Sequence, residues 1–247
     1  MGTDAGVADH GSACSDECCE PERFGAYLTD PGEYLEPTVP TGLAVRDLPV
    51  VDARDARVAA LAEVVTGDPH EYPVPVEPWP VVGNRVLDPG TGVGGGIAAG
   101  MFRCWWQGGQ LWAANEAIGG RYVIGLATQP EDIDSWLLAG SEPEQVLLWH
   151  LNYHPDGGQL FASVDGKPFL VPAVPAGPDP DLSQAVAIRS DGSVGICLRA
   201  GVWHDGVYPE SGDGEFLTRQ GAVHARVSAS LATEFGCLLR VPLLRVG

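Results

Sequence analysis

Histidine and amide side chains gather in two short stretches of this chain, at a spacing suited to one shared polar site. His150, Asn152 and His154 alternate with apolar residues, and Gln159 follows them closely. On a β-strand this alternation places the three polar side chains on one face, because successive side chains point to opposite faces. The second stretch supplies His204 behind a glycine. Imidazoles titrate near neutral pH and also bind metals, so the pattern indicates either proton transfer or metal ligation.

Other polar residues could bind a substrate carboxylate or line the same site. His224, Arg226 and Ser228 alternate on one face of a late strand, and an inward arginine there would pair with a carboxylate through two hydrogen bonds. A second group flanks a Gly-Gly turn at residues 119–120. Both groups can equally form an outward polar surface. The predicted substrate-binding residues are Arg226, His224, Arg121, Tyr122, Glu116 and Asn152.

Strands and turns dominate the chain from residue 81 onward. Two Asp-Gly pairs and two Gly-Gly pairs mark tight turns, which favour antiparallel hairpins. About ten short strands at hairpin spacing predict an all-β sandwich or barrel. The predicted strands are residues 101–106, 110–116, 121–127, 146–152, 159–164, 168–174, 185–189, 195–198, 223–229 and 236–244.

The chain divides into three predicted segments. Residues 1–22 are acidic, carry three of the six cysteines and have few large apolar side chains, which predicts a disordered tail with reduced thiols. Residues 23–80 are rich in proline and predict an extended arm that packs on the barrel, with one short amphipathic helix at 52–66. Residues 81–247 form the predicted β domain.

Charge and hydropathy exclude several classes of partner. The formal net charge is −19, from 33 acidic against 14 basic residues. Such a field opposes binding to nucleic acid and to anionic membrane surfaces. No apolar run is long enough to span a bilayer, and the first residues lack the pattern of a secretory signal, so we expect a cytoplasmic protein with no membrane partner. The predicted partner is a small carboxylate substrate.

The spacing of the polar residues resembles the two motifs of the cupin superfamily. Asn152, His154 and Gln159 stand at the ligand positions of the first motif, and His204 stands at that of the second. The resemblance implies a mainly all-β fold: a cupin-like antiparallel jelly-roll barrel, with two fused lobes, preceded by the N-terminal arm. His154, Gln159 and His204 are the implied metal ligands. Because all three are neutral, we expect no obligatory cofactor and at most a loosely bound divalent ion such as Mn, Zn or Ni.

A more specific resemblance is to the ureidoglycolate lyase family, over roughly residues 79–244. Its motifs are a His-Pro-x-Gly-x-Gln-x-Phe run, a Pro-Asp-Leu-Ser segment and a Val-Trp-His element. This chain carries the first from His154 to Phe161, the second at 180–183 and the third at 202–204. It departs from the family at Asp205, where a second histidine is common.

This resemblance implies a carbon–nitrogen lyase that cleaves ureidoglycolate to glyoxylate and urea, in allantoin degradation and purine catabolism. His154, His204 and Gln159 are the implied catalytic residues, with Arg226 or Arg121 taking the substrate carboxylate. Two alternatives stay open: a cupin lyase or hydrolase acting on another small α-hydroxy or amino acid derivative in biosynthesis, and a non-catalytic cupin that binds a small acid. The predicted assembly is a homodimer.

Overall fold

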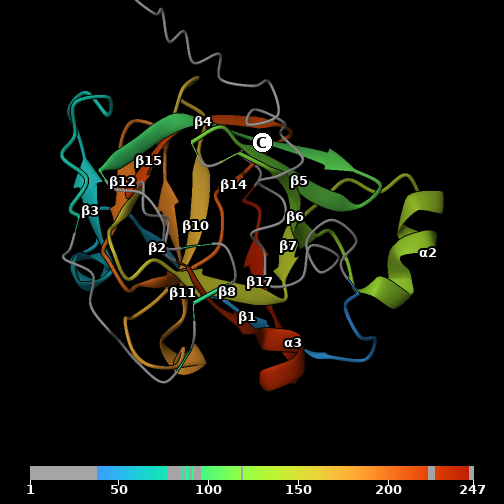
Figure 1. Cartoon of the computed structure of the whole chain (residues 1–247). Helices are drawn as coiled ribbons and strands as arrows, with labels where there is room; N and C mark the ends of the chain where they lie inside the picture. The colour runs from blue at the N-terminus through green and yellow to red at the C-terminus, as the bar shows by residue number, and fades with distance from the viewer. Residues whose placement is uncertain are drawn as a thin grey trace, which may run out of the picture.

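The computed structural model describes residues 38–76, 85, 87–88, 91, 96–117, 119–221 and 226–244. The predicted tail at 1–22 and the first part of the arm lie outside these residues. The described part is mainly β, which confirms the predicted fold class. Its strands form two sheets that surround a common interior, with the short helices at the periphery (Figure 1). No helix in this described part has the length and apolar composition needed to cross a membrane.

The larger sheet has ten strands in the order β1-β17-β7-β6-β5-β4-β15-β9-β12-β3. All its neighbours pair antiparallel except β1 and β17, which run parallel. Its members are β1 (Ala44–Asp47), β3 (Ala62–Val65), β4 (Ile97–Gln107), β5 (Gln110–Asn115), β6 (Arg121–Leu126), β7 (Gln145–Leu148), β9 (Gln159–Ser163), β12 (Gly195–Leu198), β15 (Gly214–Gly221) and β17 (Cys237–Pro242).

The smaller sheet has seven strands in the order β16-β8-β13-β10-β11-β2, with β14 also paired to β10. The β2–β11 pair is parallel and the others are antiparallel. Its members are β2 (Val50–Asp52), β8 (His150–Tyr153), β10 (Phe169–Val174), β11 (Val186–Ser190), β13 (Trp203–His204), β14 (Tyr208–Pro209) and β16 (Val227–Ser230).

Helices in the described ranges are few and short. They are the 3-10 helices η3 (Ala56–Ala60), η4 (Pro130–Asp132) and η5 (Leu182–Gln184) and the α-helices α2 (Ile133–Leu138) and α3 (Leu231–Glu234). The helix predicted at residues 52–66 is present only as η3, which is capped by the side chain of Asp55 rather than Asp52. The remainder of that segment forms strand β3, because Val64 and Val65 pair with β12 and β-branched residues suit a strand.

The described part of the predicted arm is built into the sheets rather than laid over them. β1 and β3 form the two ends of the ten-stranded sheet, and β2 adds an edge to the seven-stranded sheet. The predicted strand at 146–152 is also divided, because β7 and β8 belong to different sheets. The chain therefore crosses from one sheet to the other at Trp149, directly before the polar residues of β8.

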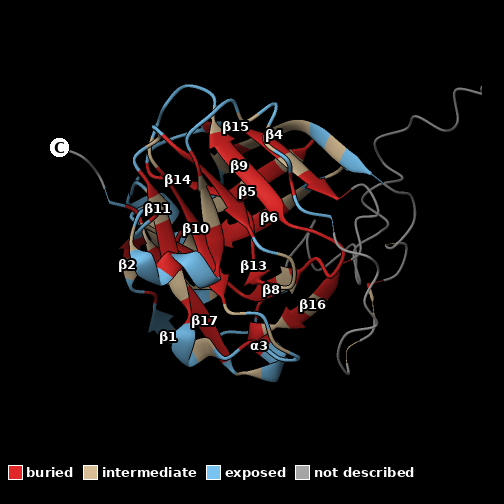
Figure 2. Ribbon diagram, turned by 90° about the vertical axis from the view of Figure 1, so that its left-hand side faces the viewer, coloured by how far each residue is buried: buried red, intermediate tan, exposed pale blue. Residues whose placement is uncertain are grey.

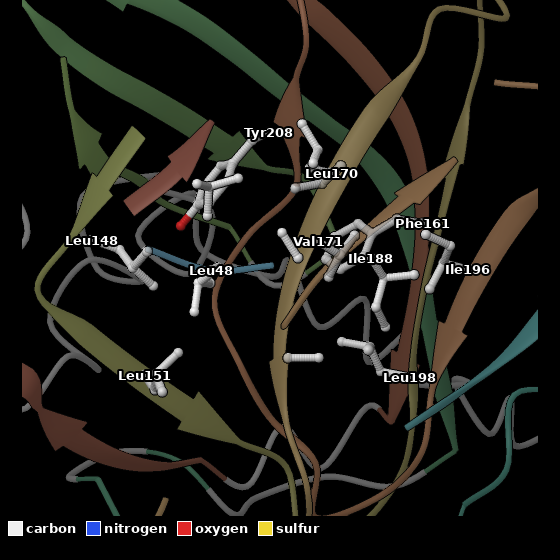
Figure 3. Close-up of a cluster of buried hydrophobic side chains, with 14 of the residues drawn as sticks. Leu48, Leu148, Leu151, Phe161, Leu170, Val171, Ile188, Ile196, Leu198 and Tyr208 are labelled. Atoms are coloured by element: carbon white, nitrogen blue, oxygen red, sulfur yellow. The ribbon is translucent and has the colours of Figure 1, made fainter. Parts of the chain in front are cut away.

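The interior is a packed apolar core to which both sheets contribute. Phe161 and Leu198 come from the ten-stranded sheet, and Leu170 and Ile188 come from the seven-stranded sheet. Figure 3 shows these side chains converging between the sheets. Figure 2 shows that buried positions follow the central strands, whereas the outer loops and helices are exposed. His154, Gln159 and His204 are buried within this enclosed environment.

Candidate active site

Two loops and three strands bring the two histidine motifs together. His154 directly follows β8, His204 ends β13, and Gln159 begins β9. The backbone N–H of Gly201 donates to the carbonyl of His154 at 2.9 Å, which ties the two motif loops to each other. Gly158 allows the close approach of β9 to β12, since a Cβ there would lie 2.3 Å from the carbonyl oxygen of Leu198.

The side chains of His154, Gln159 and His204 meet at one buried point between the sheets. Nε2 of His154 lies 3.2 Å from Oε1 of Gln159, and Nε2 of His204 lies 3.0 Å from the same atom. The two imidazole rings are 5.2 Å apart between centroids. All three residues are less than 7% exposed, so water screens their interactions little. The structure thus gathers these three residues at one point, while their chemical roles stay predictions.

The protonation of His204 follows from its surroundings. Burial and the neighbouring His154 lower the pKa of His204 to about 3, against weaker opposing effects of the Val202 carbonyl and Asp205. His204 is therefore neutral near pH 7. Its Nδ1 lies 2.7 Å from the Val202 carbonyl, which can only accept, so Nδ1 carries the proton. Nε2 therefore presents a lone pair, and the atom that it faces at 3.0 Å, Oε1 of Gln159, can only accept, so neither atom donates to the other.

A second amide extends the polar group on the ten-stranded sheet. Nε2 of Gln159 donates to Oε1 of Gln220 at 3.1 Å, and Gln220 is 1% exposed. The two glutamines are direct neighbours across the β9–β15 ladder. Gln220 was not predicted from the sequence, because β15 itself was not predicted. Two adjacent apolar residues of β15, Phe216 and Leu217, are both buried, so the strand lacks the usual alternation of apolar and polar residues.

Asn152 lies in β8 of the other sheet, and Arg226 directly precedes its strand β16. Asn152 pairs with both His204 and Ser228 across the β8 ladders, so the three share one face of the sheet. Nε of Arg226 donates to Asp88 at 2.5 Å, and Ser228 donates to the same carboxylate oxygen at 2.6 Å. Arg226 is thus buried and held at its Nε by a carboxylate far away in the sequence. The structure places it with an internal partner that the sequence did not indicate.

A separate buried cluster centres on Asp205, the residue that follows His204. Nε2 of His150 lies 3.2 Å from Oδ1 of Asp205, and the hydroxyl of Tyr208 donates to Oδ2 of the same carboxylate. Burial and Asp205 raise the pKa of Tyr208 well above its usual value, so the phenol stays protonated and keeps donating. His150 therefore contacts the side chain of Asp205.

Tyr122 also lies in this interior. Its ring packs edge-on against Phe102, with the centroids 6.4 Å apart. Burial raises the pKa of the Tyr122 hydroxyl, Arg226 opposes that rise, and Asp205 adds to it. The role of Tyr122 in substrate binding stays a prediction.

The other residues of the Gly-Gly turn lie elsewhere, which corrects two predictions. Glu116 is exposed and bound to Arg103 and to the backbone N–H of Met101. Arg121 is exposed, and its guanidinium stacks over the rings of Trp105 and Trp112 at 5.0 and 4.7 Å from their centroids. Both residues have partners at the surface, so neither reaches His154 and His204. His224 lies outside the described residues.

The donor set suits a divalent metal poorly. It offers two neutral imidazoles and one neutral amide, so no ligand cancels the charge of the ion. Within the described ranges, no group of three or more His, Cys, Asp or Glu side chains is placed to hold a metal. Asp205 is committed to His150 and Tyr208.

Comparison with known proteins finds relatives of the part of the chain that contains this site. The family model described as ureidoglycolate lyase matches residues 126–229. Ureidoglycolate lyases of Pseudomonas syringae pv. tomato and Azotobacter vinelandii are 35% and 36% identical over 91 and 97 residues, covering 36% and 38% of this chain. The ureidoglycolate lyase of Stutzerimonas stutzeri is 37% identical over 90 residues, which cover 36% of this chain and 53% of the relative.

The match covers only part of this chain and only part of each relative. The chain spans about half the length of the curated relatives it matches, 54% and 58% for the first two. His154, Gln159, His204 and Arg226 all lie inside the matched range, whereas Tyr122 precedes it. Residues 126–229, which contain most of the candidate site, are therefore similar to the ureidoglycolate lyase family.

Proposed function

We propose that this protein is a carbon–nitrogen lyase that cleaves ureidoglycolate to glyoxylate and urea. The observation that carries the proposal is the convergence of two imidazole Nε2 atoms on the Gln159 amide, inside the family-matched region. The reaction needs little more than one proton moved from oxygen to nitrogen. The carbinol O–H loses its proton, the C=O bond of glyoxylate forms, the C–N bond breaks, and the leaving nitrogen gains a proton to become urea.

The two histidines take different roles in this proposal. His204 is neutral, with its Nε2 lone pair directed toward the site, so it can accept a hydrogen bond from the ureido N–H and hold that nitrogen in place. His154 accepts the carbinol proton and delivers it to the same nitrogen. General acid–base catalysis of this kind contributes typically about 10²–10⁴-fold to a rate. Gln159 lies between both rings and orients them.

Arg226 supports recognition of the substrate carboxylate. It belongs to the seven-stranded sheet side of the interior, and Asp88 fixes its Nε. A guanidinium held at Nε can still direct its terminal nitrogens to a carboxylate. Tyr122, kept protonated by burial, provides a further donor in the field of Arg226. Arg121, which stacks on two tryptophans at the surface, is not part of the proposal.

The test is an incubation of the purified chain with ureidoglycolate, with glyoxylate and urea measured separately against a buffer blank. Equal amounts of both products above the blank support the proposal. Release of ammonia in place of urea would make the protein a hydrolase instead. Turnover only of other small α-hydroxy acid derivatives would change the substrate, and binding without turnover would make it a small-acid-binding protein.

A further inference from the structure

Thr218 is a buried polar residue that the proposed chemistry has not used. It lies in β15 and is fully buried, and its hydroxyl has no hydrogen-bond partner within the described part of the chain. Burying a hydroxyl without a partner costs about 1–3 kcal/mol, and buried polar groups nearly always have a partner. Ser190, an equally buried hydroxyl, donates to the Val194 carbonyl at 2.7 Å. Thr218 therefore calls for a functional explanation.

The strand register places Thr218 beside the candidate site. Thr218 pairs with Phe161, and Gln220 pairs with Gln159, in the same β9–β15 ladder. Residues two apart on a strand share a face and are separated by about 6.5–7 Å. The Thr218 hydroxyl thus lies on the same inner face as Gln220, one ladder step beyond the amide chain that reaches both histidines.

The inner face of the ten-stranded sheet beside Thr218 differs in chemistry from the inner face of the seven-stranded sheet. Gln159, Gln220 and Thr218 present uncharged donors and acceptors, whereas the buried cation of the site, Arg226, belongs to the other side of the interior. The buried carboxylate of Asp156 lies against Gly221, a position that alternates to the other face of β15. A neutral amide group of a ligand can form hydrogen bonds with the uncharged residues of the ten-stranded sheet, and a ligand carboxylate can pair with Arg226.

We propose that Thr218 and Gln220 form the subsite that binds the carbamoyl group of an N-carbamoyl acid, with the Thr218 hydroxyl hydrogen-bonded to that group. The proposal rests on the proposed function and deepens it, because it assigns the ureido end of the ligand to the ten-stranded sheet. It makes Thr218 a specificity residue for ligands that carry a carbamoyl group. A ligand with a carboxylate alone gains nothing from Thr218.

The test uses N-carbamoylglycine, which has the ureido and carboxylate groups but lacks the carbinol hydroxyl and cannot be cleaved. Binding to wild-type protein, Thr218→Val and Thr218→Ser is measured by calorimetry, with glycolate as the ligand without a carbamoyl group. Thr218→Val keeps the shape and removes the hydroxyl, whereas Thr218→Ser keeps the hydroxyl. We expect Thr218→Val to weaken N-carbamoylglycine binding about tenfold and Thr218→Ser to weaken it much less. Glycolate binding should be the same in all three.

A melting measurement separates this role from a structural one. Because Thr218→Val removes a buried hydroxyl with no partner, the ligand-free variant should melt about 2–4 °C higher than the wild type. Higher stability with unchanged N-carbamoylglycine affinity would overturn the proposal, as would an equal loss of affinity for glycolate. If Thr218→Val does not fold, Thr218→Ala and Thr218→Ser give the same comparison.

Failure of this inference and failure of the proposed function are distinguishable. Glyoxylate release from ureidoglycolate tests the lyase, and equilibrium binding of an uncleavable ligand tests the subsite. An active enzyme that does not bind N-carbamoylglycine, or whose binding ignores Thr218, keeps the lyase and overturns the subsite. A protein without lyase activity whose N-carbamoylglycine binding depends on the Thr218 hydroxyl keeps the subsite alone.

Discussion

Nε2 of His204, on the seven-stranded sheet, lies 3.0 Å from Oε1 of Gln159, on the ten-stranded sheet. This contact joins the two sheets. The candidate site is therefore a property of how the sheets pack, and substitutions in either sheet can change its geometry. It also gives Gln159 a position from which one amide contacts both imidazoles.

Replacing the two histidines should have different kinetic effects. His154→Gln should lower kcat for ureidoglycolate by about 10²–10⁴-fold, because it removes the proton carrier. His204→Asn should mainly raise KM, because it removes a hydrogen-bond acceptor that holds the ureido nitrogen. His70 is exposed, so His70→Gln is the matched control and should behave as wild type. Equal kcat losses in the His154 and His204 variants would contradict this division of roles.

The low pKa of His204 predicts a loss of stability in mild acid. In the folded protein the pKa is lowered from 6.5 to about 3, so the unfolded chain binds the proton first as the pH falls. The stabilisation by neutral His204 is complete above pH 6.5 and is lost as the pH falls from there toward 3. Between pH 7 and pH 5 this loss is about 2 kcal/mol.

Urea unfolding at pH 7 and pH 5, in buffer with a chelator, measures this loss. His204→Asn removes the titrating group and should show a smaller decrease in the free energy of unfolding between the two pH values. Carboxyl groups elsewhere contribute equally to both proteins and cancel in the comparison. The same decrease in wild type and variant would show that His204 is readily protonated in the folded state.

Gln159→Glu should convert the neutral donor set into a better metal site. A carboxylate between two imidazoles supplies the charge that the amide lacks, so affinity for Mn²⁺ or Zn²⁺ should rise above that of wild type. Calorimetric titration of chelator-treated protein measures the change, and Gln159→Ala controls for the altered packing. Unchanged affinity in Gln159→Glu would mean that residue 159 is not at a ligand position. In that case the register assigned to the first motif would be wrong.

Arg226 and Asp88 should depend on each other for stability and differ in their effect on substrate binding. Arg226→Gln leaves a buried carboxylate without its cation, so it should destabilise the protein by about 3–5 kcal/mol. The double change Arg226→Gln with Asp88→Asn should recover much of that stability. KM should stay raised in both, by about 10–100-fold, since neither has a cation for the substrate carboxylate.

Unfolding curves and KM measurements on both variants decide this prediction. Arg240, a half-exposed arginine paired with Asp47, gives the control change Arg240→Gln, which should affect neither quantity strongly. If the double variant regained both stability and normal KM, Arg226 would be a structural residue. The substrate carboxylate would then have to be bound elsewhere.

The sequence alone determined the fold class and the centre of the candidate site. Alternation along β8 and the fixed spacing from His154 to Gln159 are local properties, so they predicted which side chains share a face. The same is true of His204 behind Gly201. The sequence did not predict strand β15, because residues on both of its faces are buried and the alternation is lost. It also predicted one strand at 146–152, where the chain forms two strands and changes sheet at Trp149.

Only the tertiary structure decided which distant residues join the site. Gln220 reaches Gln159 through a strand pairing 61 residues apart, and Asp88 reaches Arg226 across 138 residues. Likewise, whether the turn residue Arg121 faced the interior or the surface depended on Trp105 and Trp112, whose rings cover its guanidinium. Local patterns specify the face of a strand, because side-chain direction is set by the backbone. The partner of that face is set by how the sheets pack, and that is fixed only when the whole core is buried.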